Sequence, residues 1–310
     1  MRLITSSVCV ESPLMAQATA AKSVMELRSR SAIQLHTLRD IDTPLPETIR
    51  RVADAGFEGV EFAGAFLESN PHAVREALDD TGVTPVAAHV DLTRIEANVE
   101  ALADRLRHVG CSHAIIPHLS GGHFRTTADV DALALRVEGL ADRLDNYGIQ
   151  LSYHVSREPF LPLLDRYGLA TPAQLPSPGI VWQLATEAID LTIRGSSRTL
   201  DVTAFDRLVS RTEELTFEVD VGWVAAGGYD PVAVFDRLGD RMPLIHVADV
   251  RRTQRFPPAF RSVPPGRGIL DFDRVLAACR DTDVDWLVYE DDEPEEPEPA
   301  IQHGSLLFSR

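Results

Sequence analysis

The sequence predicts an α/β protein, a single closed (β/α)₈ TIM barrel. Short apolar runs alternate with longer amphipathic stretches from Ala32 onward, which is the pattern of parallel strands joined by crossover helices. The short runs number eight, the strand count at which such a sheet closes. The chain of 310 residues, 44% of them hydrophobic, is long enough to fill one such core.

Each expected strand is a short apolar run, and each expected helix is a longer amphipathic stretch. The expected strands are Ile33–Thr37, Gly59–Phe62, Val83–His89, His113–Pro117, Ile149–His154, Leu215–Asp220, Leu244–Val247 and Trp286–Glu290. The expected helices are Leu45–Ala55, Pro71–Thr81, Arg94–Val109, Ala128–Tyr147, Val202–Glu213, Pro231–Leu238 and Phe272–Cys279. Asn70-Pro71 and Asp230-Pro231 each place a capping side chain before a proline, which indicates a helix start.

Two segments depart from this alternation. Residues 1–31 are polar and weakly patterned, so we expect an N-terminal extension, a flexible arm or an extra helix, before a barrel over 32–310. About sixty residues separate His154 from Leu215, which predicts an insertion at about 161–198 on the loop after the fifth strand. Such an insertion would serve as a lid or a contact between copies, or would be a neutral surface loop.

Acidic residues dominate the charge of the chain. The formal net charge is −17, and Lys22 is the only lysine. Such a composition is typical of halophilic proteins, because molar salt screens the self-repulsion of the charges. A genome rich in G and C would also favour Arg, Asp and Ala. The acidity argues against nucleic acid as a partner, since phosphates require a basic surface.

Cysteine usage and hydropathy favour a cytoplasmic protein. Cys9, Cys111 and Cys279 are odd in number and far apart, which indicates reduced thiols. No run of 18 apolar residues is present, so no membrane partner is expected. The N-terminal stretch also lacks the long apolar core of a signal peptide. These features are compatible with a homo-oligomer.

Polar residues end several of the expected strands. Asp220, His246 and Glu290 end three successive strands, and the other polar strand ends are Glu61, His89 and His154. The C-terminal ends of barrel strands point into the active-site mouth, so these side chains are expected to converge. Carboxylates combined with imidazoles suit one divalent ion, Mn²⁺ first, with Mg²⁺, Zn²⁺ or Co²⁺ as alternatives.

These motifs resemble those of the xylose isomerase-like barrels, in particular the sugar phosphate isomerase/epimerase group that contains inosose dehydratases. The resemblance covers about residues 32–310 and is specific in FEVDVGWVAAGGYDP at 217–231, LIHVADV at 244–250, PPGRGILDF at 264–272 and VYEDDEPEEP at 288–297. It is general in IQLHTLRD at 33–40 and GFEGVEFAG at 56–64. The resemblance implies that Asp220, His246 and Glu290 are metal ligands and that Glu290 also acts as an acid or base.

The fifth strand departs from the family pattern. Family members have a glutamate ligand there, or a His-Asn-His sequence followed by Glu-Phe, whereas this chain has YHVSREPF at 153–160. The resemblance therefore leaves His154 and Glu158 as alternatives for the fourth ligand or for the catalytic base. A second departure is Ala248, where lysine is usual. Both departures leave open an altered substrate or a barrel without activity.

Four residues are candidates for substrate contacts. Glu61 and His89 would contact the substrate or form structural hydrogen bonds. Trp223 would stack on the apolar face of a sugar or pack into the protein. Arg267 would bind a phosphate or carboxylate through two hydrogen bonds, or form an exposed ion pair.

The resemblance implies a small-molecule sugar or cyclitol substrate, and an isomerase or epimerase of sugars or sugar phosphates in carbohydrate metabolism. The reaction would move a proton next to a carbonyl through a metal-bound enediolate. Glu290, Glu158 or His154 would take the proton. Loss of a β-hydroxyl at the same site would give an inosose-type dehydratase. A non-catalytic sugar-binding barrel is the alternative from another class, and an abasic-site endonuclease is disfavoured because the basic face it would need is not visible.

Overall fold

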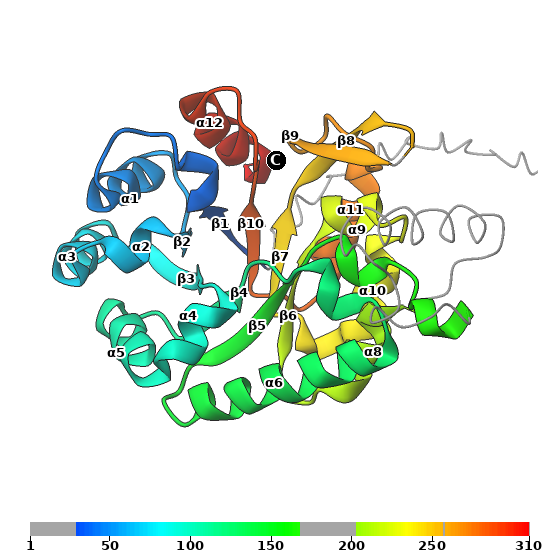
Figure 1. Cartoon of the computed structure of the whole chain (residues 1–310). Helices are drawn as coiled ribbons and strands as arrows, with labels where there is room; N and C mark the ends of the chain where they lie inside the picture. Colours follow the sequence, from blue (N-terminus) through cyan, green and yellow to red (C-terminus); the bar gives the residue numbers. More distant parts are fainter. Residues whose placement is uncertain (1–28, 168–202, 257, 310) are drawn as a thin grey trace, which may run out of the picture.

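Eight parallel strands close into a barrel in the order β1-β10-β7-β6-β5-β4-β3-β2, with helices around it (Figure 1). The computed structural model describes residues 29–167, 203–256 and 258–309. The predicted (β/α)₈ fold is confirmed. The barrel strands are β1 (Arg30–Gln34), β2 (Gly59–Phe62), β3 (Thr84–His89), β4 (His113–Ile116), β5 (Gln150–Val155), β6 (Thr216–Asp220), β7 (Leu244–Val247) and β10 (Trp286–Tyr289).

Helices follow the strands along the chain and cover the outside of the barrel. The α-helices are α1 (Leu45–Asp54), α2 (Ala65–Glu68), α3 (Pro71–Thr81), α4 (Leu92–Ala97), α5 (Val99–Val109), α6 (Thr127–Asp145), α8 (Ala204–Arg211), α9 (Val221–Ala226), α10 (Pro231–Leu238), α11 (Phe272–Asp281) and α12 (Pro297–Phe308). The 3₁₀ turns are η1 (Leu35–Leu38), η2 (Gly121–Phe124), η3 (Glu158–Phe160), η4 (Leu164–Tyr167) and η7 (Gly239–Arg241). The side chains of Asn70 and Asp230 cap α3 and α10, as their motifs predict.

Two elements differ from the prediction for local reasons. The first strand was expected at Ile33–Thr37, but β1 ends at Gln34, whose side chain accepts the backbone N–H of His36 and starts η1. The helix expected at Arg94–Val109 is two helices, α4 and α5. Asn98 separates them, because it leaves the helical conformation with ψ at 89° and caps α5 with its side chain.

Two further elements lie outside the eight βα units and were not predicted. Strands β8 (Asp249–Gln254) and β9 (Ala259–Val263) form an antiparallel hairpin between β7 and α11. Helix α12 follows β10 and lies near this hairpin in Figure 1. Gly304 of α12 packs closely on the barrel, since a Cβ there would lie 2.7 Å from the ring of Tyr289.

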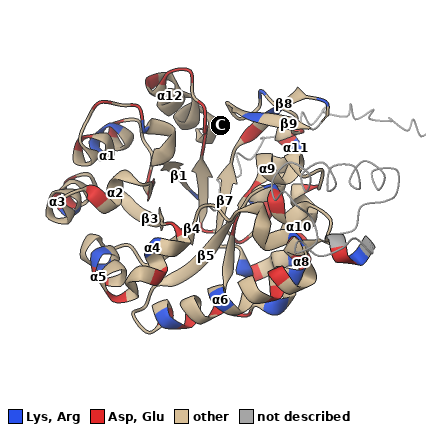
Figure 2. Cartoon of the chain, viewed as in Figure 1, with Lys and Arg blue, Asp and Glu red and all other residues tan. Residues whose placement is uncertain are grey.

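The interior of the barrel has an apolar layer below a polar one. Ala32 lies two positions before Gln34, and Leu244 lies two positions before His246, so each pair faces the same side of its strand. The apolar layer is a cluster of buried residues, Ala32, Val86, Ala87, Ile115, Leu244, Trp286 and Val288. Acidic and basic residues are frequent in the helices that surround the barrel (Figure 2).

Several expectations concern residues that the structure does not describe. The extension at 1–31 falls almost wholly on residues 1–28, and most of the insertion at about 161–198 falls on residues 168–202; both lie outside the described residues. Cys9 is also outside them, whereas Cys111 and Cys279 are buried free thiols. Within the described part of the chain, no helix is both long and apolar enough to cross a membrane.

Candidate metal centre

A polar layer of seven ionisable side chains lies at the C-terminal ends of the barrel strands. Six of them are almost fully buried, and His89 keeps only 11% of its side chain exposed. They come from β2, β3, β5, β6 and β7 and from the residue after β10: Glu61, His89, His154, Glu218, Asp220, His246 and Glu290. Burying charges at this density is costly unless they pair with one another or with a cation.

Four residues of this layer that were also predicted from the sequence as metal ligands lie close together. One ligand atom from each of His154, Asp220, His246 and Glu290 lies within 4.8 Å of the others. His246 Nδ1 is 2.6 Å from the Glu290 carboxylate. The four residues therefore form a compact set of two imidazoles and two carboxylates, a donor set that fits one divalent ion.

The two carboxylate oxygens of Asp220 have different surroundings. Its Oδ1 accepts the backbone N–H of Trp223 at 2.8 Å and caps α9, which starts directly after β6. Its Oδ2 is buried and has no hydrogen-bond partner. A buried carboxylate oxygen without a partner is unfavourable, and a cation in the set would satisfy it.

Two more carboxylates lie beneath this set. Glu218 Oε2 is 2.9 Å from His154 Nδ1 and 2.9 Å from His89 Nε2. Glu61 Oε2 is 2.6 Å from His246 Nε2 and also accepts a hydrogen bond from Gln34 at 2.9 Å. The sequence reasoning did not single out Glu218 or Gln34. Strand alternation was the available signal for Glu218, because it lies two positions before Asp220 and shares its face.

The pKa values show how the acidic and basic side chains of this layer balance one another. Burial would lower the pKa of His89, but Glu61 and Glu218 outweigh this effect and raise it to about 10. The pKa of His246 is raised well above its usual value for the same reason. Burial would raise the pKa of Glu290, but His246 lowers it to about 2. The pKa of Asp220, in contrast, is raised by burial to about 7. Protonated histidines thus supply the positive charge.

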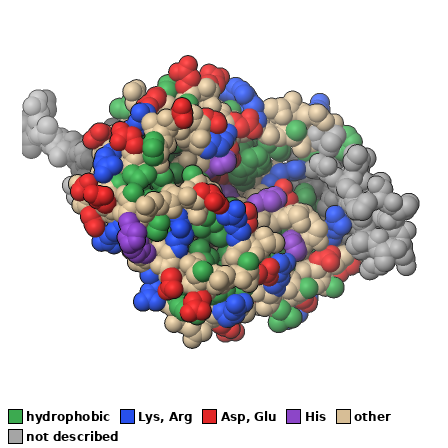
Figure 3. All heavy atoms as spheres, turned by 60° about the vertical axis from the view of Figure 1, so that its left-hand side comes forward, with side chains coloured by type: hydrophobic (Ala, Val, Ile, Leu, Met, Phe, Trp, Pro, Cys, Tyr) green, Lys and Arg blue, Asp and Glu red, His purple; other side chains and the backbone are tan. Residues whose placement is uncertain are grey.

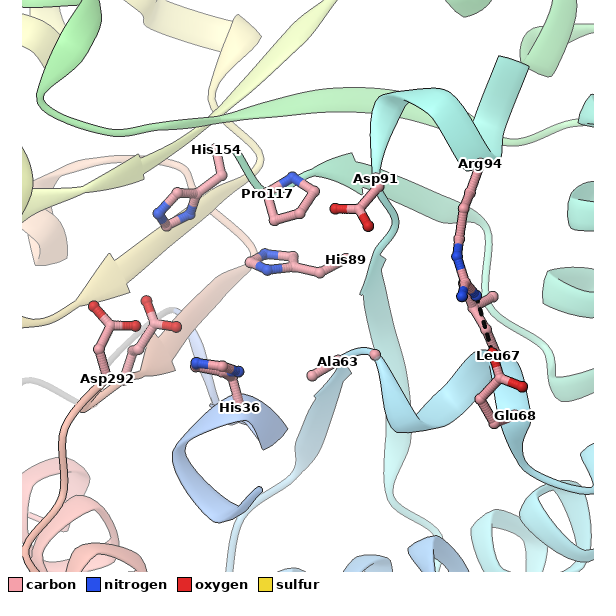
Figure 4. A pocket seen from close by; sticks show the side chains of 12 residues that line it. His36, Ala63, Leu67, Glu68, His89, Asp91, Arg94, Pro117, His154 and Asp292 are labelled. Carbon is pink, nitrogen blue, oxygen red and sulfur yellow. Dashed lines mark hydrogen bonds and ion pairs between the residues drawn. The ribbon is translucent and has the colours of Figure 1, made fainter. Parts of the chain in front are cut away.

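A cavity of about 440 Å³ opens beside the metal set. Figure 3 shows a hollow in the surface with histidine side chains inside it, and Figure 4 shows the lining. His89, His154 and Glu290 line the cavity and connect it to the polar layer. The remaining lining residues are His36, Ala63, Gly64, Leu67, Glu68, Asp91, Arg94, Pro117 and Asp292.

Three residues predicted for the site are not among the lining residues of this cavity. Glu158 lies in η3 and accepts a hydrogen bond from the Ser156 hydroxyl at 2.7 Å. Trp223 reaches the site indirectly, because its Nε1–H donates to Asp292 Oδ2 at 3.1 Å. Arg267 is exposed beside the β8–β9 hairpin and lines a different cavity. For the fourth ligand, the geometry favours His154 over Glu158.

The strand-7 aspartate has a structural role. Asp249 is fully buried, and its two carboxylate oxygens accept the backbone N–H groups of Gly266, Gly268, Ile269 and Leu270 at 2.8–3.3 Å. A Cβ on Gly268 would lie 2.1 Å from Asp249 Oδ1, so only glycine allows this approach. The motif at 244–250 and the segment at 264–272 are therefore in direct contact, through the Asp249 carboxylate and the backbone of residues 266–270.

Comparison with known proteins gives one family and several relatives. A family model described as xylose isomerase-like TIM barrel matches residues 49–309. An inosose dehydratase from Geobacillus kaustophilus is 23% identical over 283 residues, which cover 83% of this chain and 82% of that protein.

Solved structures share the fold of this chain. A sugar phosphate isomerase/epimerase from Parabacteroides distasonis aligns with a TM-score of 0.66 at 15% identity, covering 93% of this chain and 97% of the other. An IOLI protein with a bound zinc atom aligns with a TM-score of 0.61 at 14% identity, covering 90% and 96%. At these identities the likeness concerns the fold alone.

Proposed function

The chain belongs to the xylose isomerase-like TIM barrel family, and we propose that it is a divalent-metal-dependent isomerase or epimerase of a sugar that transfers a proton next to a carbonyl group. The observation that carries this proposal is the buried set of His154, Asp220, His246 and Glu290 beside a cavity of about 440 Å³. Cavities of this size suit small-molecule substrates.

The donor set supports a resident divalent ion, for which we propose Mn²⁺, with Mg²⁺, Zn²⁺ and Co²⁺ as alternatives. His154, Asp220, His246 and Glu290 would hold it, and the partnerless Oδ2 of Asp220 supports this assignment. When bound, the ion would polarise a carbonyl group and stabilise negative charge that develops beside it.

The chain itself would supply the proton acceptor. Glu290 and His154 line the cavity, so both are in reach of a substrate there, whereas Glu158 is bonded to Ser156 and does not line it. Glu290 is the stronger candidate, because the neighbouring His246 holds its carboxylate in the ionised form, whereas the raised pKa of His154 leaves that ring protonated and unable to accept a proton.

The charges that line the cavity favour an uncharged sugar or cyclitol over a sugar phosphate. Asp91 and Asp292 lie on the cavity wall (Figure 4), where carboxylates accept hydrogen bonds from hydroxyl groups and repel a phosphate. The cations among the described lining residues are each paired with a carboxylate: Arg94 with Glu68 at 3.1 Å, and the protonated His89 and His154 with Glu218 at 2.9 Å.

An inosose-type dehydratase is the second candidate, and the similarity to an inosose dehydratase over 83% of the chain favours it. Both reactions begin with removal of a proton next to a carbonyl group. They differ afterwards, since the dehydratase expels a hydroxyl group from the neighbouring carbon.

The proposal is tested by metal analysis followed by exchange in D₂O. Protein purified without chelator is analysed for metals and incubated with ketoses and inososes in D₂O, and NMR follows deuterium uptake next to the carbonyl. We expect about one divalent ion per chain, exchange with at least one substrate, and loss of both in Asp220→Asn. Glu96→Gln, a surface control in an ion pair with Arg136, should retain both. Bound metal without exchange on any substrate would support the non-catalytic sugar-binding barrel.

A further inference from the structure

We propose that Glu218 is a positioning residue that, together with Glu61, determines which ring nitrogen His154 and His246 present to the metal ion. This inference rests on the ligand set of the proposed function. Glu218 is fully buried in β6, two positions before Asp220, and therefore points into the same barrel interior. It lies directly beneath the two histidines of that set.

Glu218 and Glu61 assign a proton to one nitrogen of each ring. Glu218 Oε2 is hydrogen-bonded to His154 Nδ1 at 2.9 Å, and Glu61 Oε2 is hydrogen-bonded to His246 Nε2 at 2.6 Å; Glu218 Oε1 adds an ion-pair contact with the same His246 nitrogen at 2.9 Å. A carboxylate only accepts hydrogen bonds, so both nitrogens must carry hydrogen to satisfy these two carboxylates. Each imidazole then has one nitrogen left as a ligand, Nε2 of His154 and Nδ1 of His246. His246 Nδ1 is the atom that faces Glu290.

Other residues reinforce the same arrangement. Glu61 lies 2.6 Å from His246 Nε2 and accepts a hydrogen bond from Gln34, which holds it in place. The His154 and His246 rings lie 4.9 Å apart between centroids, and His89 lies 5.4 and 5.6 Å from them. Three imidazoles this close need a shared negative partner, and Glu218 contacts all three.

A second metal ion at Glu218 is the competing explanation. His89, His154, Glu218 and His246 also bring ligand atoms within 4.8 Å of one another. This lower group shares His154 and His246 with the upper set, however. Two ions would need both nitrogens of the shared rings free of hydrogen, which the adjacent carboxylates oppose. One ion above and supporting carboxylates below leave each shared ring one nitrogen for the ion and one N–H for a carboxylate.

The test measures metal binding by the full chain. Mn²⁺ affinity is determined by chelator competition for the parent and for the variants Glu218→Gln, Asp220→Asn and Glu96→Gln, the last being a surface control in an exposed ion pair with Arg136. We expect Glu218→Gln to weaken binding by about 10- to 100-fold, the range found for residues that orient metal-bound histidines. Asp220→Asn should weaken it further, and Glu96→Gln should leave it unchanged.

A second readout separates positioning from general damage. In the Zn²⁺-loaded parent, NMR of ¹⁵N-labelled histidines should show Nδ1–H on His154 and Nε2–H on His246, and Glu218→Gln should change the state of His154. If Glu218→Gln does not fold, Glu61→Gln should still lower the affinity through His246. Unchanged affinity in Glu218→Gln, the opposite tautomers, or two ions per chain in the parent would overturn the inference. Unchanged affinity in Asp220→Asn would instead overturn the proposed ligand set.

Discussion

Replacing Asp220 by asparagine should stabilise the metal-free protein. The side chain is buried, one of its oxygens has no partner, and burial raises its pKa from 3.8 to about 7. Asparagine keeps the oxygen that caps α9 but carries no charge. The substitution therefore removes a buried charge whose cost His154 and His246 offset only in part, and it leaves the helix cap in place.

The pKa shift sets the size and the pH range of this effect. A shift of about three pKa units corresponds to at most about 4 kcal/mol of unfolding free energy. Because the pKa of this carboxyl is raised on folding, its ionisation costs nothing below pH 3.8, costs progressively more between pH 3.8 and 7, and reaches its full cost above pH 7. Asp220→Asn should thus be more stable than the parent at pH 8 and equal to it near pH 4.

Urea unfolding with and without metal provides the assay. With EDTA at pH 8, the midpoint for Asp220→Asn should exceed that of the parent. Mn²⁺ at about 1,000 times its dissociation constant should raise the unfolding free energy of the parent, and not that of the variant, by about 4 kcal/mol. The two proteins should then be about equally stable. A metal-free Asp220→Asn protein that is less stable than the parent at pH 8 would refute this reasoning about the site.

Three other predictions follow from the charges of the molecule. Metal binding should release protons and tighten as the pH rises, because the raised pKa values of His154 and His246 leave protons on the apo protein; calorimetry in buffers of different ionisation enthalpy measures this, and zero release would contradict it. The melting temperature should rise between low salt and molar KCl, since screening relieves the repulsion of a net charge of −17, whereas a flat response would favour genome composition as the cause. D-fructose 6-phosphate should bind the metal-loaded protein about tenfold more weakly than D-fructose, and Asp91→Asn should narrow the difference; tighter binding of the phosphate would show that the cavity wall does not select against charge.

The barrel was predictable from the sequence because its strands and helices follow strong local rules. Gly59–Phe62, Leu244–Val247 and Pro71–Thr81 have the predicted bounds, since apolar runs and proline-marked helix starts define them. The β8–β9 hairpin was missed because its strands are largely exposed and carry arginines, so they lack the apolar alternation of a half-buried strand.

The candidate site was predictable where a strand ends in a polar residue, as at Asp220 and His246. Glu218 was overlooked because only the last polar residue of each strand was considered, although a parallel barrel strand turns every second side chain inward. Glu158 was considered because Glu158-Pro159-Phe160 resembles a shifted form of the family's Glu-Phe near the end of the fifth strand. The turn after β5 instead directs its carboxylate to Ser156, a contact that depends on tertiary geometry.

Asp249 anchors both ends of the segment that carries the β8–β9 hairpin, because it starts β8 and accepts the backbone N–H groups at 266–270. The barrel therefore holds this segment at two buried points, Asp249 and Ser262, whose hydroxyl donates to Asp291 and accepts the backbone N–H of Asp292. Homologous barrels should tolerate insertions, deletions and exchanged sequences between these points, from Arg251 to Arg261, while strand 7 and α11 keep their positions. The hairpin is thus a natural point for this fold to diversify and for engineers to graft a binding loop beside the cavity, provided that Asp249 and Gly268 are retained.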